Sequence, residues 1–587
     1  MKLSRISLAI IPLLSLCSVQ AAVYNVVEIG EVSEVKSTYA AAINDAGDAV
    51  FNGAIKLQTQ DLFGNSSIDY HYFNFPLNLD AIDFDSDAVK ALFTEEQLAA
   101  LLNGDIDNTI LSILLNVNPS EQPTGNALGF LRKDNQSAQN VILRDSATPS
   151  RTNSEYLYDI NNAGVAVGTA TAPYTLVSFT PEPTEAQPEP EARNEWVPEL
   201  PNQQGMIVKN GEVRAIPAPY QEFAGGYTVA AAISDTGFIA GFGSSGMTEA
   251  NQTLIEATCT GASTPQAVCY NANAVSSYEQ RAMVWQMQPD GNVGQPQIYG
   301  FLGDKNTGIA FDGEGNDAVT YYSQAIDVND NGLAVGVSMY SDSDRLIRFQ
   351  NGFTVFDAIY RQAHASIFVD GGALPIVDPA EWFVNDPRVI GSSAVAVNNN
   401  DIIVGYARKT INSGIRGKMF YHDYSSGQTR FIDGFFASST TVPRAINDNN
   451  QIVGQAEVII GGTSTRRPHG FIYDITTDKF VDLNTLLSCN APYTVVDATD
   501  INENGDIVAT ALVKKERRNL LGEVVLDASG NPQLEELAVA IKLQYIANGE
   551  EENCQTEQTE YERQAGSTGF GSLLLACVAL WWRRRIV

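Results

Sequence analysis

Short hydrophobic runs with β-strand character, separated by turn-forming residues, recur along most of this chain. The clearest copy spans residues 469–511 and contains four such runs, HGFIYD, KFVDL, YTVVDA and DIVATA. Short runs rich in Val, Ile, Phe and Tyr are typical of β-strands, and Asn, Asp and Gly between the runs favour tight turns. The pattern therefore predicts a four-stranded antiparallel meander as the repeating unit.

The last turn of that unit occurs seven times, as AINDAGDAV, DINNAGVAVG, AISDTGFIAG, DVNDNGLAVG, AVNNNDIIVG, AINDNNQIVG and DINENGDIVA. The position three residues after the aligned Asn or Ser always holds a residue type that enters the left-handed backbone conformation at low cost. These seven residues are Gly47, Gly164, Gly237, Gly332, Asp401, Asn450 and Gly505. We expect each to close a tight strand-turn-strand hairpin as a structural turn.

The strand that resembles HGFIYD also occurs seven times, starting at Ala127, Gln204, Arg281, Arg345, Gly417, His469 and Ala538. The chain opens with YNVVEIG, which matches KFVDL, and the last repeated strand is the one that should precede it. The two ends therefore complete one repeat together, as a ring without open edges requires. We predict an all-β protein, a seven-bladed β-propeller over residues 23–547, closed by its N- and C-terminal strands. A β-solenoid is the alternative, because repeats of this length occur in both.

The repeats are unevenly spaced, which predicts insertions near residues 54–126, 171–203, 244–280 and 358–393. In the first insertion, Thr94 and Gln97 have the spacing of a capping box and predict a small amphipathic helix. In the last, Trp382 and Phe383 lie beside several Asp residues, which suits stacking on sugar rings or a loop that plugs the blade interface. We expect the insertions to form the surface that binds a glycan or protein ligand.

The two ends of the chain carry targeting signals. Residues 1–22 combine basic residues, an apolar run and terminal small residues, which is the pattern of a secretory signal peptide. A polar spacer, 548–565, precedes a tail, 566–587, whose short apolar run ends in three Arg residues. The tail predicts a transmembrane helix that anchors the exported protein transiently in the inner membrane.

Charge and cysteine content agree with export. The formal net charge of −33 argues against nucleic acid as a partner and fits a soluble extracellular protein or one that binds cations. Four cysteines lie between the two targeting segments, and we expect the pairs Cys259–Cys269 and Cys489–Cys554 in an oxidising compartment. Four free thiols are the alternative.

Two of the hairpins carry a D-x-N-x-N-G pattern, the first half of a calcium loop: Asp327, Asn329 and Asn331, and Asp500, Asn502 and Asn504. Ser338 and Ala511 stand where such a loop has a bidentate Glu. Structural turns and calcium sites both remain open as interpretations. The sequence contains no catalytic motif, so we assign no catalytic residue and no cofactor other than this candidate calcium. A binding or scaffold protein is the predicted function. A secreted carbohydrate-active or other hydrolytic enzyme that uses carboxylates at the propeller face is the alternative.

The tail resembles the Gly-Gly C-terminal sorting signal of Gram-negative bacteria in Gly566, Ser567 and Gly569. That resemblance implies a sorting protease and the type II secretion machinery as partners, and a cell-surface or extracellular location. The repeats resemble the HAF family of extracellular repeats at residues 469–471, and the overall layout is similar to an exported family of unknown function. These resemblances imply location and architecture but no activity.

Overall fold

The computed structural model describes most of the chain between residues 22 and 552. Within that range it does not describe residues 33–34, 36, 55, 61–65, 71–84, 103–108, 111–112, 114–126, 145–152, 184, 186–187, 263, 304–320, 340–344, 352–353, 361–362, 377–390, 412–413, 460–464 and 518–523. The signal peptide before Ala22, most of the spacer, the sorting tail and the pair Trp382 and Phe383 lie outside the described residues.

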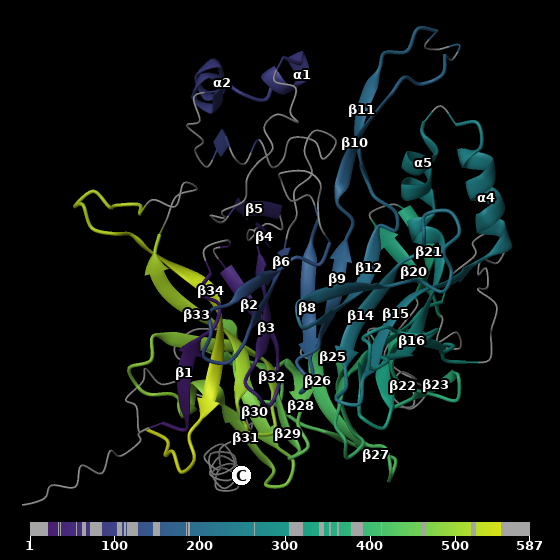
Figure 1. The fold of residues 1–587 in the computed structure, drawn as a ribbon. Helices are drawn as coiled ribbons and strands as arrows, with labels where there is room; N and C mark the ends of the chain where they lie inside the picture. The colour runs from purple at the N-terminus through teal and green to yellow at the C-terminus, as the bar shows by residue number, and fades with distance from the viewer. Residues whose placement is uncertain are drawn as a thin grey trace, which may run out of the picture.

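Seven four-stranded antiparallel sheets form the blades of a propeller (Figure 1). The order across each sheet is as follows: blade 1, β2 (Ser37–Ile43), β3 (Ala49–Ala54), β6 (Ala127–Arg132), β7 (Gln139–Val141); blade 2, β8 (Glu155–Ile160), β9 (Ala166–Thr171), β12 (Gln203–Lys209), β13 (Glu212–Ile216); blade 3, β14 (Thr228–Ile233), β15 (Phe238–Met247), β16 (Tyr278–Gln286), β17 (Gln297–Ile298); blade 4, β18 (Ser323–Val328), β19 (Ala334–Met339), β22 (Ala363–Val369), β23 (Gly372–Pro375); blade 5, β24 (Ser392–Val397), β25 (Ile402–Ile411), β26 (Gly414–Asp423), β27 (Gln428–Phe431); blade 6, β28 (Thr441–Ile446), β29 (Gln451–Ile459), β30 (Arg466–Asp474), β31 (Lys479–Asp482); blade 7, β32 (Tyr493–Ile501), β33 (Ile507–Glu516), β34 (Leu534–Tyr545), β1 (Tyr24–Glu28).

The hydrophobic core is divided into layers between neighbouring blades. Trp285 of blade 3, for example, is only 1% exposed and belongs to one cluster with Ile207 of blade 2. Within blade 1, the rings of Phe51 and Phe130 stack with centroids 5.1 Å apart. Because the middle strands are covered on both faces, they read as nearly continuous hydrophobic runs rather than strict alternation.

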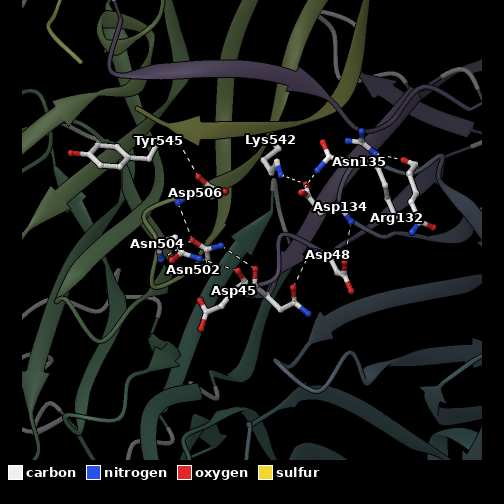
Figure 2. Close-up of polar contacts among 12 residues, drawn as sticks. Asp45, Asp48, Arg132, Asp134, Asn135, Asn502, Asn504, Asp506, Lys542 and Tyr545 are labelled. Carbon is white, nitrogen blue, oxygen red and sulfur yellow. Dashed lines mark hydrogen bonds and ion pairs between the residues drawn. The ribbon is translucent and has the colours of Figure 1, made fainter. Parts of the chain in front are cut away.

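The ring is closed by pairing between the two ends of the described chain. β1 pairs with β34 from Tyr24↔Tyr545 to Glu28↔Ile541. Across the junction, Lys542 of blade 7 forms an ion pair with Asp134, beside blade 1, whose backbone N–H donates to Asp48 (Figure 2). The predicted propeller is confirmed, and the split repeat that distinguished it from a solenoid is the closing blade.

Most of the extra segments leave the blades at the same connection, between the second and third strands. They comprise β4 (Lys56–Gln60) and β5 (Ser66–Tyr70) with α1 (Asp87–Lys90) and α2 (Glu95–Leu102), β10 (Tyr174–Phe179) with β11 (Arg193–Pro198), α4 (Glu249–Cys259) with α5 (Gln266–Asn273) and η2 (Val275–Ser277), and β20 (Arg345–Asn351) with β21 (Thr354–Tyr360). Another short helix, η4 (Leu483–Leu486), joins blades 6 and 7. Because the strands alternate in direction, these insertions share one end of the propeller, at the top of Figure 1. We call that end the insertion face and the opposite end the hairpin face.

Two details differ from the sequence interpretation. The strand that starts at Arg345 is not part of blade 4, because β20 pairs only with β21 and the third strand of the blade is β22. The insertion predicted near 358–393 therefore overlaps blade strands β22 and β23. Both segments are short β-rich runs, and periodicity alone does not say which of them joins the blade.

The predicted helix of the first insertion is present as α2. Its N-terminus has the reciprocal capping-box bonds, from Gln97 N–H to Thr94 Oγ1 at 3.1 Å and from Thr94 N–H to Gln97 Oε1 at 2.9 Å. The second insertion contains the hairpin β10–β11, which its Pro- and Glu-rich sequence does not suggest.

Candidate functional site

The seven repeated turns meet around the propeller axis at the hairpin face. The residues at the predicted turn positions all have positive φ, between 58° at Asp401 and 84° at Gly237. Within each turn the aligned polar side chain bonds the backbone. Asn161 Oδ1, for example, accepts from the N–H groups of Ala163 at 3.1 Å and Val165 at 3.0 Å. An Asn that bonds the backbone N–H two residues ahead pre-forms the turn, and a residue that tolerates positive φ then completes it.

The same Asn side chains also link the blades into a closed ring. Each Asn donates its Nδ2–H to the backbone carbonyl of the equivalent residue in the next blade, at 3.0 or 3.1 Å. The members, which we call the Asn ring, are Asn44, Asn161, Ser234, Asn329, Asn398, Asn447 and Asn502. Ser234 lacks this donor, and Thr236 bridges to the next blade instead, through its hydroxyl to the Asp330 carbonyl at 3.0 Å.

A second ring, formed by the residues that follow, surrounds the mouth of the axis. We call these residues the acidic rim: Asp45, Asn162, Asp235, Asp330, Asn399, Asp448 and Glu503. Asn162 donates its Nδ2–H groups to Asp45 at 2.8 Å and to Asp235 at 2.6 Å. Asn399 does the same for Asp330 and Asp448. The two amides thus separate some of the like charges and hold the neighbouring carboxylates in place.

The acidic rim and the Asn ring, apart from Asn447, line an axial cavity of about 430 Å³. Its electrostatics are strongly negative, because five of the seven rim residues are carboxylates. Partial burial, together with the charges of Asp448 and Asp45, raises the pKa of Glu503. Figure 2 shows the part of the rim where blade 7 meets blade 1, with Asn504 donating to the Asp45 carbonyl at 2.9 Å.

Three aspartates lie deeper along the axis, two residues before the Asn ring, and each bridges two blades. Asp327 accepts from the N–H groups of Val328 and Val397, both at 2.8 Å. Asp159 and Asp500 make the equivalent pairs of bonds. A β-bulge in each first strand places these residues at the axis.

Burial raises the pKa of all three aspartates despite their hydrogen bonds. The pKa of Asp159 rises to about 6, and those of Asp327 and Asp500 rise to about 7. Repulsion by Asp159 contributes to the last two. The three carboxyl groups therefore titrate near neutral pH, far above the ordinary range of an aspartate.

The candidate calcium residues are engaged in these turn and blade contacts. Asn329 Oδ1 accepts from the N–H groups of Asn331 and Leu333, and Asp500 binds the backbone of blades 7 and 1. Among the residues that the structure describes, no three His, Cys, Asp or Glu side chains gather as metal ligands. Hydrogen bonding accounts for the D-x-N-x-N-G pattern, and calcium at the hairpins stays a prediction.

The disulfide Cys259–Cys269 is present, and it ties α4 to α5 on the insertion face, with Cα atoms 5.6 Å apart. Both sulfur-bearing residues belong to a satellite hydrophobic cluster with Ile255 and Tyr278. Cys554 lies outside the described residues, so the pair Cys489–Cys554 stays a prediction.

The described carboxylates of the first strands are committed to structural contacts. Asp497 forms a bidentate pair with Arg444 of blade 6, with Nε–Oδ1 at 3.2 Å and Nη2–Oδ2 at 2.9 Å. Glu155 Oε1 accepts from two backbone N–H groups at 3.0 Å. A carboxylate pair for hydrolysis, as the alternative function requires, would have to give up such bonds.

The model of a family described as a protein of unknown function (DUF3466) matches residues 1–585 of the chain. The chain belongs to this family. No curated protein matches it.

Among solved structures, the chain is similar to dipeptidyl peptidase 4 of Porphyromonas gingivalis, at 10% identity and a TM-score of 0.29, over 66% of this chain and 47% of that one. It is also similar to the acylaminoacyl peptidase of Pyrococcus horikoshii, at 10% identity and a TM-score of 0.30, over 85% and 60%. The chain thus spans about half to three-fifths of the length of these two proteins. Likeness at this level carries no argument about activity.

In the described part of this family member, no helix is long and apolar enough to cross a membrane. The predicted C-terminal transmembrane helix lies outside those residues.

Sequence reasoning identified the turn residues but missed what joins the turns to one another. The rim position is polar in all seven repeats, which was a readable signal. The hydrogen bond that each Asn side chain donates to the neighbouring blade has no separate sequence signature, because the same Asn also forms the turn.

Proposed function

We propose that this family member is an exported β-propeller that binds a ligand through its insertion face, with the hairpin face acting as the scaffold. One observation carries the proposal: the insertions leave their blades at the same connection and therefore gather on one face. A scaffold that varies its loops on one face only is the usual arrangement for a binding protein.

The hairpin face supports the scaffold role. Its polar side chains are largely used to bond one blade to the next. Such groups have little capacity left for a ligand.

Export is supported by the disulfide, because such bonds persist in oxidising compartments, and by the predicted signal peptide. The resemblance of the tail to a Gly-Gly sorting signal, and of the repeats to HAF repeats, favours a surface or extracellular location. A sorting protease and type II secretion would then be the partners that deliver the protein.

Fractionation of cells that express the full chain tests the export proposal. We expect the protein in the medium or at the cell surface, without residues 1–22, and deletion of 566–587 to change its release. A variant that lacks residues 2–22 should remain in the cytoplasm. Cytoplasmic retention of the complete chain would contradict the proposal.

A glycan array and a pull-down from culture supernatant test the binding proposal. The variant removes residues 175–197 of the β10–β11 hairpin, as blade 5 shows that a blade can join β25 to β26 through two residues. The matched control is Asn504→Ala on the hairpin face. We expect the variant that lacks residues 175–197, or variants that lack the other insertions, to lose binding of ligands that Asn504→Ala still binds. Binding that only the hairpin-face change abolishes would reverse the assignment of the two faces.

A further inference from the structure

A cavity of about 330 Å³ opens between blades 4 and 5 at the insertion-face end of their strands. Its lining includes Tyr322, Gln324, Ser393, Tyr406 and Arg408. Pockets that hold small ligands begin at about 300 Å³ and combine aromatic surface with a few polar groups. This cavity has that size and that composition.

The charged group of the cavity is an arginine that lies over an aromatic ring. The guanidinium carbon of Arg408 is 5.9 Å from the centroid of the Tyr406 ring. Arg408 is exposed, and no described carboxylate forms an ion pair with it. A planar guanidinium of this kind is suited to bidentate binding of a carboxylate.

Basic side chains are also found on the strand ends of blades 5 and 6 at the insertion face, in contrast to the acidic rim at the other end of the axis. Lys409, Arg416, Arg466 and Arg467 lie on the strand ends of blades 5 and 6 that reach the insertion face. Two carboxylates lie among them: Glu457, shared by Arg416 at 3.6 Å and Arg466 at 2.7 Å, and Asp433, paired with Lys418 at 3.0 Å. Surplus positive charge at one place on an acidic protein attracts an anionic ligand and repels cations.

The polar and aromatic groups further restrict the ligand. Tyr322 and Tyr406 line the cavity, and aromatic rings are suited to packing against the apolar faces of a sugar ring. Ser393 lies directly across the strand pair from Tyr406, and its hydroxyl makes a long bond of 3.3 Å to the Ala394 carbonyl. The amide of Gln324 supplies both a donor and an acceptor for hydroxyl groups.

We propose that this cavity binds an acidic saccharide, with the carboxylate of a uronate unit paired to Arg408 and its ring packed against Tyr406. This inference rests on the proposed binding role of the insertion face and names the class of ligand for it. Gln324 and Ser393 hydrogen-bond hydroxyl groups of the sugar, and the basic side chains of blades 5 and 6 receive further uronate units of a longer chain.

Calorimetric titration of the intact protein with trigalacturonate tests the proposal, with uncharged galactotriose as the matched ligand. We expect trigalacturonate to bind with a Kd below about 1 mM, and galactotriose to bind at least about tenfold more weakly. Arg408→Gln should weaken trigalacturonate binding by about tenfold or more and leave the binding of galactotriose unchanged. The matched control, Arg430→Gln, removes an exposed arginine from the outer strand of the same blade and should change neither.

A second variant, Tyr406→Leu, keeps apolar volume but removes the aromatic face, and it should weaken both ligands. Equal affinity for the charged and uncharged ligands, or an unchanged affinity in Arg408→Gln, would overturn the inference. Absence of trigalacturonate binding at about 5 mM would overturn it as well. The glycan array tests the binding role separately. Capture of a neutral glycan by the insertion face would support that role but would contradict the proposal that the ligand is a uronate.

Discussion

The two faces of this propeller are built from the same seven repeats in opposite ways. On the hairpin face the turn between the first and second strands has the same length in every blade, and polar side chains bond each of these turns to the next. On the insertion face the connections range from the two residues between β25 and β26 to the 72 between β3 and β6. The difference shows that one end of the ring holds the blades in register, which leaves the other end free to vary.

The largest effect should follow from breaking the ring on the hairpin face. In Asn502→Ala, the Asn44 carbonyl loses one of its two donors, and the N–H groups of Asn504 and Asp506 lose a side-chain acceptor. We expect the free energy of unfolding to fall by about 3 kcal/mol, because three hydrogen bonds are lost and each is worth about 1 kcal/mol. Urea unfolding measures the change. Asn504→Ala, which loses one exposed bond, is the control and should cost less than about 1 kcal/mol.

On the insertion face, loss of a cross-link should stay local. Cys259→Ala with Cys269→Ala removes a disulfide that closes a ten-residue separation, worth about 3 kcal/mol in the loop-entropy estimate. We expect faster proteolysis within residues 248–277, while the main unfolding transition of the blades keeps its midpoint. A large fall in that midpoint would mean that the insertion face also holds the ring together.

The axial aspartates should make stability depend on pH. Because their pKa values are raised above that of an unfolded aspartate, the folded protein binds more protons between about pH 4 and 7, and stability falls as pH rises through that range. Asp500→Asn should reduce the loss of unfolding free energy between pH 5 and 7 by about 2 kcal/mol.

The opposite control is Asp423→Asn. Hydrogen bonds from Ser425 and Ser426 lower the pKa of this exposed carboxyl to about 2. Its contribution is present above about pH 4 and is lost as pH falls toward 2, so the variant should leave the pH 5 to 7 interval unchanged. An identical response of Asp500→Asn and Asp423→Asn would contradict the burial of the axial carboxylates.

The smallest effect concerns a single turn. Gly164 has φ of 70°, and an added Cβ would meet no atom within 4 Å, so Gly164→Ala should cost only the backbone strain of about 1 kcal/mol. Gly164→Asn should cost less, because Asn450 occupies the equivalent position at φ of 62°. Thermal melts of the two variants compare them. A greater loss in the Asn variant would show that the side chain, not the backbone, limits this position.

The repeated strands and turns of the blades could be predicted from the sequence, because the same pattern occurs seven times. The positive-φ residues, the closing strand that begins at Tyr24 and the capping box at Thr94 each have a local cause that the sequence records. The prediction that the strand starting at Arg345 belongs to a blade was wrong, because β20 has strand character but pairs with β21. Strand pairing depends on which strands are neighbours in space.

The contacts between blades could not be predicted in this way, because no local sequence pattern indicates them. Asn447 and Asn502 are 55 residues apart, and the uneven insertions hide which turn lies beside which. The cavity that holds Arg408 and Tyr406 is built where strands from two blades diverge, so no spacing in the sequence brings these residues together with Tyr322.

The pairing of β1 with β34 also governs how the chain folds. β1, which begins at Tyr24, pairs with β34, which ends at Tyr545. More than five hundred residues must therefore be synthesised after β1 before its partner strand exists. Contacts of such sequence separation slow folding, because the entropy of closing the loop is lost before the contact stabilises anything. Until then β34 is an unpaired edge, to which a strand of another chain can add. The step that completes blade 7 is therefore also the step that covers this edge.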